Sequence, residues 1–444
     1  MGQKENQKAY QSRVHPDNIP NKPFLGLGSF GDLGPGEPAL SEWKSLGLSL
    51  PNVDAMRRYR LSRLRQKLNE QDCGAILLFD PMNVRYATDS TNMQLWCTHN
   101  AVRYALVFAE GPVMLWDFHG CEHLSSHLPL VDEVRNAKGF FYFAAGHRGQ
   151  EISEKWGDEL HSLMLNYMGG NKRLAVDKVE PLGNQQLTQR GWQIVEGQAL
   201  TETARSIKGP DELKAMRCAI AAAEAGVKAM QQALKPGVSE QELWAVLHAE
   251  NILRGGEWIE TRLLASGPRT NPWFQECSSR IIENGDIVAF DTDLVGPYGY
   301  MCDISRTWLA GDKPPTPEQR DLYAFSREHI ARNLDIIKPG MSFLEFSEKS
   351  FPLREAFIAN RYSLISHGVG MCDEWPGIYY PIDNPATGYD GEIKPGMTMT
   401  MESLIGEEGG RECVKLEEQF LVTETGIEVL SSYPWEDERF GYGG

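Results

Sequence analysis

The stretch that decides the fold of this chain is FDTDLVGPYGYMCDISR, residues 290 to 306. It is apolar and strand-like for most of its length, yet it carries three carboxylates, Asp291, Asp293 and Asp303. Side chains alternate along a strand, so Asp291 and Asp293 are expected on one face. The GPYG segment predicts a hairpin that returns Asp303 to the same place. Carboxylates this close repel each other unless a metal ion or a proton lies between them, so the stretch indicates a cation site.

Three further polar side chains stand in later strand-like runs: His367 in SHGVG, Glu402 in TMTMES and Glu417 in VKLEEQ. In most of these runs no Lys or Arg stands at a matching position, and buried carboxylates are costly unless they are neutralised. Each acid alone would more often be a solvated strand residue, so the prediction depends on their joint occurrence. Together they predict a divalent metal centre with these ligands: Asp291, Asp293, Asp303, His367, Glu402 and Glu417. Five oxygen donors favour an octahedral ion such as iron or manganese over tetrahedral zinc, and the ligand count leaves one ion or two open.

Bulk composition narrows the class of protein. The chain has 444 residues, 41% of them hydrophobic, which is enough for two or three domains. A net charge of -17 argues against a nucleic-acid partner. Eight scattered cysteines without a CxxC pair predict free thiols in a reducing compartment, and hence a cytoplasmic protein. The start lacks an apolar signal region, and no apolar run approaches membrane-spanning length, so we expect no membrane contact.

The pattern of residues predicts three segments. Residues 1–50 are rich in Gly, Pro and polar groups, which indicates an extended arm that packs on a domain or a partner subunit. Residues 51–204 alternate between helical and strand-like patterns, as in an α/β domain. A long Ala-rich helix with Pro210 in its first turn opens the last segment, 205–444. There a helix pair followed by a strand pair occurs twice, which hints at a pseudo-twofold construction.

The region from about 200 to 430 resembles the pita-bread metallopeptidase family, which includes methionine aminopeptidase, prolidase, Xaa-Pro aminopeptidase and creatinase. The resemblance is carried by GYMCDISRT, SHGVG, PGMTMTMES and VKLEEQFLVTETGIEVL, in the family order and at fitting spacings. SIKGPDELKAMRCA is similar to the family's entry into its catalytic domain. The resemblance implies an α/β (α+β) protein, with a creatinase-like N-terminal domain followed by a pita-bread catalytic domain with metal in its central sheet.

Two departures from the family set this chain apart. Family peptidases carry a His after ASGxNxxxP, where this chain has Trp273, and a second His where this chain has Asp373. This combination, with the doubled acids Asp291 and Asp293, is similar to a divergent branch of the family that cleaves dimethylsulfoniopropionate (DMSP). The resemblance then implies a metal-dependent lyase, with iron as the metal, that converts DMSP to dimethyl sulfide and acrylate by β-elimination.

β-Elimination needs a base for the α-proton and a binding place for the sulfonium group. Asp373 is the candidate base because it follows ligand His367 by six residues. Aromatic faces attract a sulfonium cation, and Tyr362 and Trp96 are the candidates for that role. Trp96 belongs to the N-terminal domain and could serve only across a domain or subunit interface. Together with the arm, it suggests a homodimer.

Two alternatives stay open. An Xaa-Pro dipeptidase, aminopeptidase or creatinase-like hydrolase would use the same metal ligands, but Trp273 and Asp373 argue against it. A non-catalytic pita-bread module that binds peptides or proteins would not need the ligand set, which is complete here.

Overall fold

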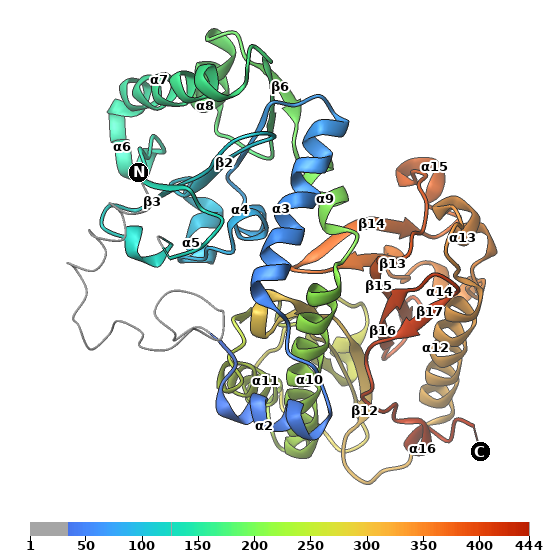
Figure 1. Cartoon of the computed structure of the whole chain (residues 1–444). Coiled ribbons are helices and arrows are strands. Elements are labelled where there is room, and N and C mark those ends of the chain that lie inside the picture. The colour runs from blue at the N-terminus through green and yellow to red at the C-terminus, as the bar shows by residue number, and fades with distance from the viewer. Residues whose placement is uncertain (1–33, 126, 444) are drawn as a thin grey trace. The chain divides into compact units, whose positions relative to one another are not determined.

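The structure is a computed structural model that describes residues 34–125 and 127–443. The chain divides into two compact units. Pro51–Arg205 belong to the first unit, and Pro35–Leu50 join the residues from Ser206 onward in the second. Each unit is described by itself below, under the labels of Figure 1.

The first unit is built on one six-stranded sheet of order β4-β3-β2-β1-β5-β6. Its strands are β1 (Ala75–Leu78), β2 (Tyr104–Phe108), β3 (Val113–Asp117), β4 (Glu133–Asn136), β5 (Arg173–Val176) and β6 (Gln193–Glu196). β1, β2 and β3 pair antiparallel, whereas β1, β5 and β6 pair parallel. Strands with buried residues throughout, such as β1 and β2, need cover on both faces.

Helices supply that cover. Trp156 and Leu160 of α7 belong to the same core cluster as Leu77 and Leu106 of the sheet. α3 packs on α4 and α9, and α4 packs on β1 and β2. The helices of this unit are α3 (Val53–Glu70), α4 (Pro81–Thr88), α5 (Gln94–His99), α6 (Tyr142–Ala145), α7 (Gly149–Tyr167), α8 (Pro181–Gln189) and α9 (Gln198–Arg205), with short 3-10 turns at Glu122–Leu124 and Gly146–Arg148.

The second unit repeats a helix-pair and strand arrangement, which confirms the predicted pseudo-twofold construction. The first half has α10 (Pro210–Ala233), α11 (Glu240–Leu253), β7 (Trp258–Ile259), β8 (Leu264–Ser266), β9 (Ile287–Asp291), β10 (Leu294–Val295), β11 (Met301–Cys302) and β12 (Ser305–Leu309). The second half has α12 (Pro317–Ile336), α13 (Phe343–Lys349), α14 (Glu355–Ile358), β13 (Leu364–Val369), β14 (Asp373–Tyr379), α15 (Asn384–Thr387), β15 (Thr398–Ile405), β16 (Val414–Val422), β17 (Ile427–Val429) and α16 (Asp437–Phe440). Two 3-10 turns lie at Gly267–Thr270 and Pro297–Gly299.

The sheets of the two halves meet along β16. The first half has the orders β12-β9-β8 and β11-β10-β7, and the second half has the order β14-β13-β15-β16-β17. β16 contacts both β12 and β9, and α12 packs on β15 and β16. β13, β15 and β16 therefore lie side by side in the second-half sheet (Figure 1), and β16 brings this sheet against β9.

Local sequence signals fix the helix starts in this unit. Ser239 and Glu242 form a reciprocal capping box on α11, in which Glu242 N donates to Ser239 Oγ at 3.1 Å and Ser239 N donates to Glu242 Oε2 at 2.8 Å. Pro210 stands in the first turn of α10, where its missing N–H removes no helical bond.

One element differs from the sequence prediction. Where an extended arm is expected over 1–50, residues Glu37–Ser45 form α2, which belongs to the second unit. Trp43 of α2 is buried against Tyr298 with ring centroids 5.9 Å apart, and Arg254 donates to both carboxylate oxygens of Glu42. The remainder of the predicted arm, residues 1–33, lies outside the described residues.

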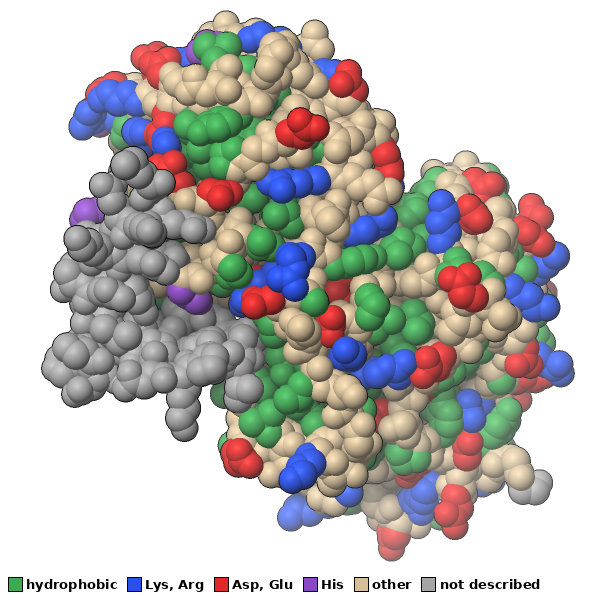
Figure 2. Space-filling model, viewed as in Figure 1, with side chains coloured by type: hydrophobic (Ala, Val, Ile, Leu, Met, Phe, Trp, Pro, Cys, Tyr) green, Lys and Arg blue, Asp and Glu red, His purple; other side chains and the backbone are tan. Residues whose placement is uncertain are grey.

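The surface is charged and mixed. On the face in Figure 2, Lys and Arg side chains lie interspersed with Asp and Glu and form no continuous basic surface. No helix in the described part of the chain combines the length and the apolar character that crossing a membrane requires.

Candidate metal centre

The first three acids meet because the strand breaks between them. β9 ends at Asp291, and Asp293 has a φ of 35°, in the left-handed region. Thr292 holds this kink, since its hydroxyl donates to Cys302 O and accepts from Ile304 N, both at 2.9 Å. As a result Asp291, Asp293 and Asp303 each offer an oxygen within 4.8 Å of the others.

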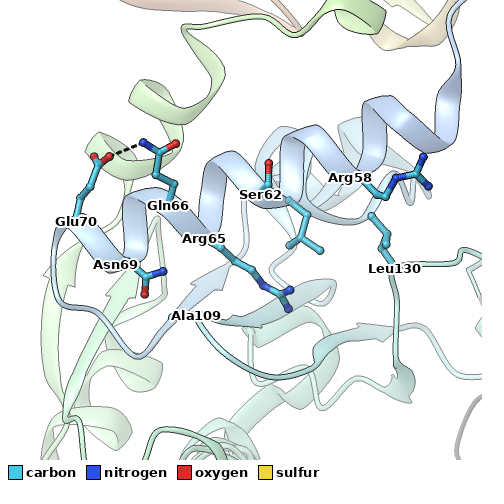
Figure 3. Close-up of a pocket in the computed structure, with 9 residues that line it drawn as sticks. Arg58, Ser62, Arg65, Gln66, Asn69, Glu70, Ala109 and Leu130 are labelled. Carbon is cyan, nitrogen blue, oxygen red and sulfur yellow. Dashed lines mark hydrogen bonds between the residues drawn. The ribbon is translucent and has the colours of Figure 1, made fainter.

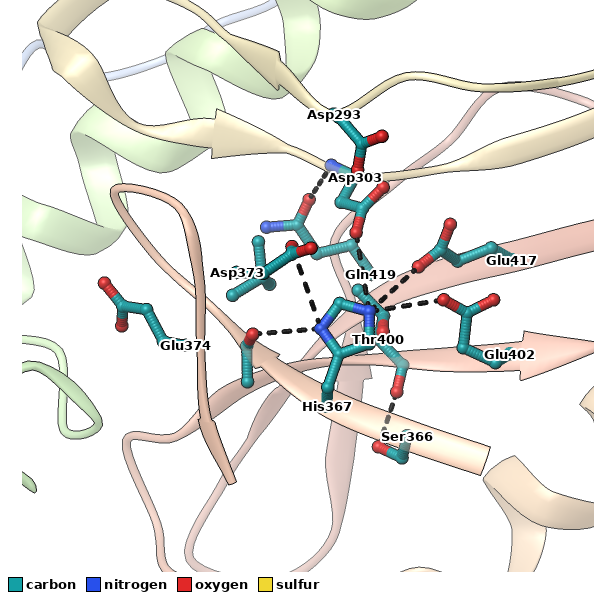
Figure 4. Close-up of polar contacts among 12 residues, drawn as sticks. Asp293, Asp303, Ser366, His367, Asp373, Glu374, Thr400, Glu402, Glu417 and Gln419 are labelled. Atoms are coloured by element: carbon teal, nitrogen blue, oxygen red, sulfur yellow. Dashed lines mark hydrogen bonds and ion pairs between the residues drawn. The ribbon is translucent and has the colours of Figure 1, made fainter. Parts of the chain in front are cut away.

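The second half of the unit contributes His367 from β13, Glu402 from β15 and Glu417 from β16 (Figure 4). Glu402 and Glu417 lie directly opposite each other across the β15–β16 ladder, an arrangement that destabilises a sheet unless a cation lies between them. His367 Nε2 lies 3.2 Å from Glu402 Oε1, 3.6 Å from Asp303 Oδ2 and 3.7 Å from Glu417 Oε1. His367 Nδ1 lies 3.1 Å from Gly368 O, so this hydrogen bond places the proton on Nδ1 and leaves Nε2 as the donor atom for a metal.

All six predicted ligands are thus brought together, and all six are buried. Within the part of the chain that the structure describes, Asp303 Oδ1 and Glu417 Oε1 are buried side-chain oxygens with no hydrogen-bond partner. Such orphaned oxygens are costly unless something positive satisfies them. The donor set, five carboxylates and one imidazole, therefore fits a divalent cation.

The electrostatics of the cluster support the same conclusion. Burial, followed by the charge of neighbouring carboxylates, raises the pKa of Asp293, Asp303 and Glu417 well above the ordinary range. Burial lowers the pKa of His367, but the negative charge of Asp373 and Glu402 outweighs it and raises that pKa to about 9. These upward shifts favour protons on the cluster when no divalent ion is bound, and such an ion would compete with the protons for the same oxygens.

A residue that the sequence prediction missed lies in the same cluster. Lys415 is fully buried on β16, and its Nζ lies 2.6 Å from Glu402 Oε2, 2.9 Å from Asp291 Oδ2 and 3.3 Å from Glu417 Oε2. Ser305 Oγ accepts from the same ammonium at 2.7 Å. β16 is therefore the exception to the observation that most of these acidic runs lack a matching Lys or Arg. The signal was present in VKLEEQ, because residues two apart on a strand share a face.

Lys415 divides the carboxylate oxygens into two sets. It binds the Oε2 atoms of Glu402 and Glu417, while their Oε1 atoms face His367. Burial raises the pKa of Asp291, but the charge of Lys415 outweighs this effect and holds that pKa at about 2. Asp291 is therefore an anion whether or not a metal is bound.

Asp373 lies at the edge of the cluster and differs from the ligands in exposure. It begins β14, its side chain is 52% exposed, and its Oδ1 lies 3.8 Å from His367 Nδ1. The loop before it is anchored by buried Glu374, which accepts from Met371 N at 3.0 Å and from Lys208 Nζ at 2.9 Å. This anchoring aims the Asp373 carboxylate at the cluster.

The candidate aromatic residues are placed differently. Tyr362 lies in the catalytic unit, and Lys415 Nζ is 4.9 Å from its ring centroid, so this ring is adjacent to the metal ligands. Trp273, at the position of the family His, is buried in the hydrophobic core of the same unit. Trp96 lies on α5 of the first unit, where its ring centroid is 5.3 Å from that of Phe118.

A groove of about 660 Å³ runs beside α3 in the first unit (Figure 3). Two of its charged groups, Arg65 and Glu70, already have partners within that unit. Arg65 donates to the carbonyl oxygens of Phe108 and Gly111, and Gln66 donates to Glu70. These residues do not form a cluster of metal donors or nucleophiles.

Family models and solved structures agree on the class of protein. The model "Creatinase/Prolidase N-terminal domain" matches residues 60–207, and "Metallopeptidase family M24" matches residues 214–424. The structure is similar to an Xaa-Pro dipeptidase from Bacillus anthracis, with a TM-score of 0.67 at 23% identity over 85% of this chain and 98% of that one. It is also similar to an X-Pro aminopeptidase from Thermotoga maritima, with a TM-score of 0.68 at 19% identity over 84% of this chain and 97% of that one. The fold and the donor set thus define a creatinase-like protein with an M24-type, pita-bread catalytic domain.

Sequence relatives narrow the class further. The chain is 48% identical over 92% of its length to a dimethylsulfoniopropionate lyase DddP from Roseovarius nubinhibens, and it covers 93% of that protein. It is 45% identical over 94% of its length to a DddP from Roseobacter denitrificans, of which it covers 96%. An Xaa-Pro dipeptidase from Pyrococcus furiosus is 29% identical over only 51% of this chain. The chain therefore belongs to the DddP family of dimethylsulfoniopropionate lyases, a divergent part of the M24 metallopeptidases.

Proposed function

We propose that this protein is a metal-dependent lyase that cleaves DMSP to dimethyl sulfide, acrylate and a proton. The observation that carries the proposal is a complete set of buried metal donors beside a half-exposed carboxylate, Asp373, at the position where the family peptidases have a histidine. Identities of 48% and 45% to two DMSP lyases over nearly the whole chain support the same substrate.

Asp291, Asp293, Asp303, His367, Glu402 and Glu417 are the proposed metal ligands. A divalent ion held there supplies Lewis-acid binding of the substrate carboxylate, which acidifies the α-C–H bond. Lys415 contacts three of the proposed ligands, Asp291, Glu402 and Glu417, on the side away from His367, and its charge holds the pKa of Asp291 low.

Asp373 is the proposed base. Its carboxylate takes the α-proton, the electron pair of that C–H bond forms the C=C bond of acrylate, and the C–S pair leaves on sulfur as neutral dimethyl sulfide. Burial against the cluster and the charges of Asp291 and Glu402 raise the pKa of Asp373, while His367 lowers it, and the net shift is upward. An upward shift makes a carboxylate a better base at neutral pH. No nucleophile and no acid are needed, because a thioether leaves without a proton.

Tyr362 and Trp96 are the proposed substrate-binding aromatics. Tyr362 is supported by its place beside Lys415 and the ligands. Trp96 is half-buried among Phe118 and Phe141, next to exposed Leu95 and Phe143. Exposed apolar side chains around Trp96 support a homodimer in which a second copy covers this surface, because contiguous apolar patches are typical of interaction sites.

The finer assignments of the centre are also proposals. Oxygen-rich coordination supports iron, with manganese or zinc as alternatives. The donors form overlapping groups that share Asp303 and His367, and this arrangement suits either one ion or two. Eight cysteines with no disulfide among them support a reducing, cytoplasmic location.

The competing function is an Xaa-Pro dipeptidase. It is favoured by the fold alone, whereas Trp273 and Asp373 stand where the family peptidases have histidines. A non-catalytic binding module is disfavoured because the donor set is complete.

The test is a direct comparison of substrates on purified, metal-analysed protein. Dimethyl sulfide in the headspace and acrylate in solution are expected from DMSP, without cleavage of an Xaa-Pro dipeptide. Turnover of the dipeptide alone would establish the hydrolase, and fully active protein without bound metal would exclude a metal-dependent mechanism.

A further inference from the structure

Phe274 is a large apolar residue with an unusual backbone conformation and a high exposure, and packing in the hydrophobic core accounts for neither. Its φ is 70°, in the left-handed region that bulky residues rarely adopt, and the residue is 59% exposed. The preceding residue, Trp273, is buried. Strained residues of this kind persist where the surrounding structure holds them in place, and they cluster at ligand-binding sites.

The surrounding structure does hold this segment. Asn271 Nδ2 donates to Glu407 O at 2.8 Å and to Gly410 O at 3.0 Å. Asn360 Nδ2 donates to Asn271 Oδ1 at 2.8 Å, and Asn360 lies two residues before Tyr362. The segments that carry Phe274 and Tyr362 are therefore tied to each other by side-chain hydrogen bonds.

Phe274 also stacks on Tyr362, with ring centroids 5.4 Å apart and planes inclined by 24°. The Tyr362 ring already has a cation against it, because Lys415 Nζ lies 4.9 Å from its centroid. The same ammonium binds Glu402 and Glu417. A continuous layer thus runs from the metal ligands through Lys415 and Tyr362 to Phe274, and the aromatic surface that stays open to a second cation belongs to Phe274.

We propose that Phe274 is a further substrate-binding residue, whose exposed ring receives the sulfonium methyl groups of the substrate next to Tyr362, on which it stacks. This inference rests on the proposed DMSP-cleaving function. A sulfonium cation is attracted to the negative face of an aromatic ring, whereas the neutral thioether product is not. Phe274 therefore holds the substrate and loses this attraction to the sulfur group once the C–S bond breaks.

The experiment compares Phe274→Leu with the wild-type holoenzyme, with Phe274→Tyr as the aromatic control. Loss of one cation–π contact is expected to raise the KM for DMSP about two- to thirty-fold, with kcat changed less than about two-fold. Phe274→Tyr is expected to keep the wild-type KM. Metal content is measured on every sample, to show that the centre is intact.

A neutral isostere separates recognition of the cation from loss of packing. In 4-methylpentanoate an isopropyl group replaces the dimethylsulfonium group, so its inhibition constant is expected to stay within about two-fold in Phe274→Leu. An unchanged KM for DMSP, or a parallel rise in the inhibition constant of the isostere, would overturn the inference. If the wild-type protein released no dimethyl sulfide, the proposed function would be overturned, and this inference with it. If the wild type were active and the KM for DMSP were unchanged in Phe274→Leu, only the inference would be overturned.

Discussion

Lys415→Met is expected to destabilise the metal-free protein far more than the metal-bound protein. The Lys415 ammonium is fully buried and lies within 3.3 Å of Asp291, Glu402 and Glu417. Removing one partner from a buried charge cluster leaves uncompensated charge and costs about 3–5 kcal/mol. A divalent ion held by the proposed ligands would neutralise the same carboxylates, so we expect the loss with metal bound to fall to less than about half of that value.

The assay is urea unfolding, followed with EDTA and again with saturating Mn²⁺, and the quantity compared is the free energy of unfolding in water. Lys394→Met is the matched control, because Lys394 is 55% exposed and its contact with Glu392 spans 3.5 Å. A surface change of this kind costs less than about 0.5 kcal/mol in both conditions. Lys415→Gln retains a hydrogen-bond donor without the charge and separates charge from packing.

Two results would refute the reasoning about Lys415. One is a loss below about 1 kcal/mol in EDTA, which would mean that the carboxylates do not depend on the ammonium. The other is an equal loss with and without Mn²⁺, which would mean that the ion and Lys415 do not share these ligands.

Three further predictions follow from the geometry. Asp373→Ala is expected to lower kcat by at least about 100-fold with metal content near wild type, whereas His367→Ala is expected to lose metal and activity together. Elemental analysis and headspace detection of dimethyl sulfide distinguish the two variants. An Asp373→Ala variant that stayed active would remove Asp373 from the mechanism. Burial lowers the pKa of His329 in the folded protein from 6.5 to about 4. As the pH falls from 6.5 to 4, the imidazole is therefore protonated in the unfolded state but not in the folded state, and the free energy of unfolding decreases. This loss reaches about 3 kcal/mol relative to His329→Gln in metal-free protein, and equal pH profiles of unfolding for the two proteins would contradict it. Phe143→Glu is expected to convert the proposed dimer to a monomer in sedimentation experiments, and a dimer of unchanged affinity would place the interface elsewhere.

Much of the centre could be predicted because its charged residues stand within apolar, strand-like runs, where charged residues are unusual. Asp291 and Glu402 stand in strands that are otherwise buried and apolar, which is costly without a cation. Lys415 could have been found by the same argument, since it shares a strand face with Glu417. It was missed because a lysine next to acids in sequence is ordinarily taken as a surface ion pair.

Other features depend on structure that the sequence does not encode locally. The left-handed φ of Phe274 is set by hydrogen bonds from Asn271 to a segment about 140 residues later. The exposure of Asp373, compared with the burial of Glu374 beside it, is decided by the ion pair between Glu374 and Lys208. α2 was hidden because Gly and Pro on both sides of Glu37–Ser45 indicate irregular structure, and only its packing in the second unit reveals why a helix forms.

The change from hydrolysis to elimination on this scaffold requires little rebuilding. Peptide hydrolysis needs an activated water and a proton for the leaving amine, whereas β-elimination from a sulfonium needs only a base, because the thioether leaves as a neutral molecule. Lys415 contacts three of the buried acids of the cluster, Asp291, Glu402 and Glu417, whereas the side chain of Asp373 is 52% exposed. With the assignments proposed above, Asp373 would supply the base and the Phe274 ring would supply an open aromatic face for the cation, which is all that the elimination requires of the protein beyond the metal centre.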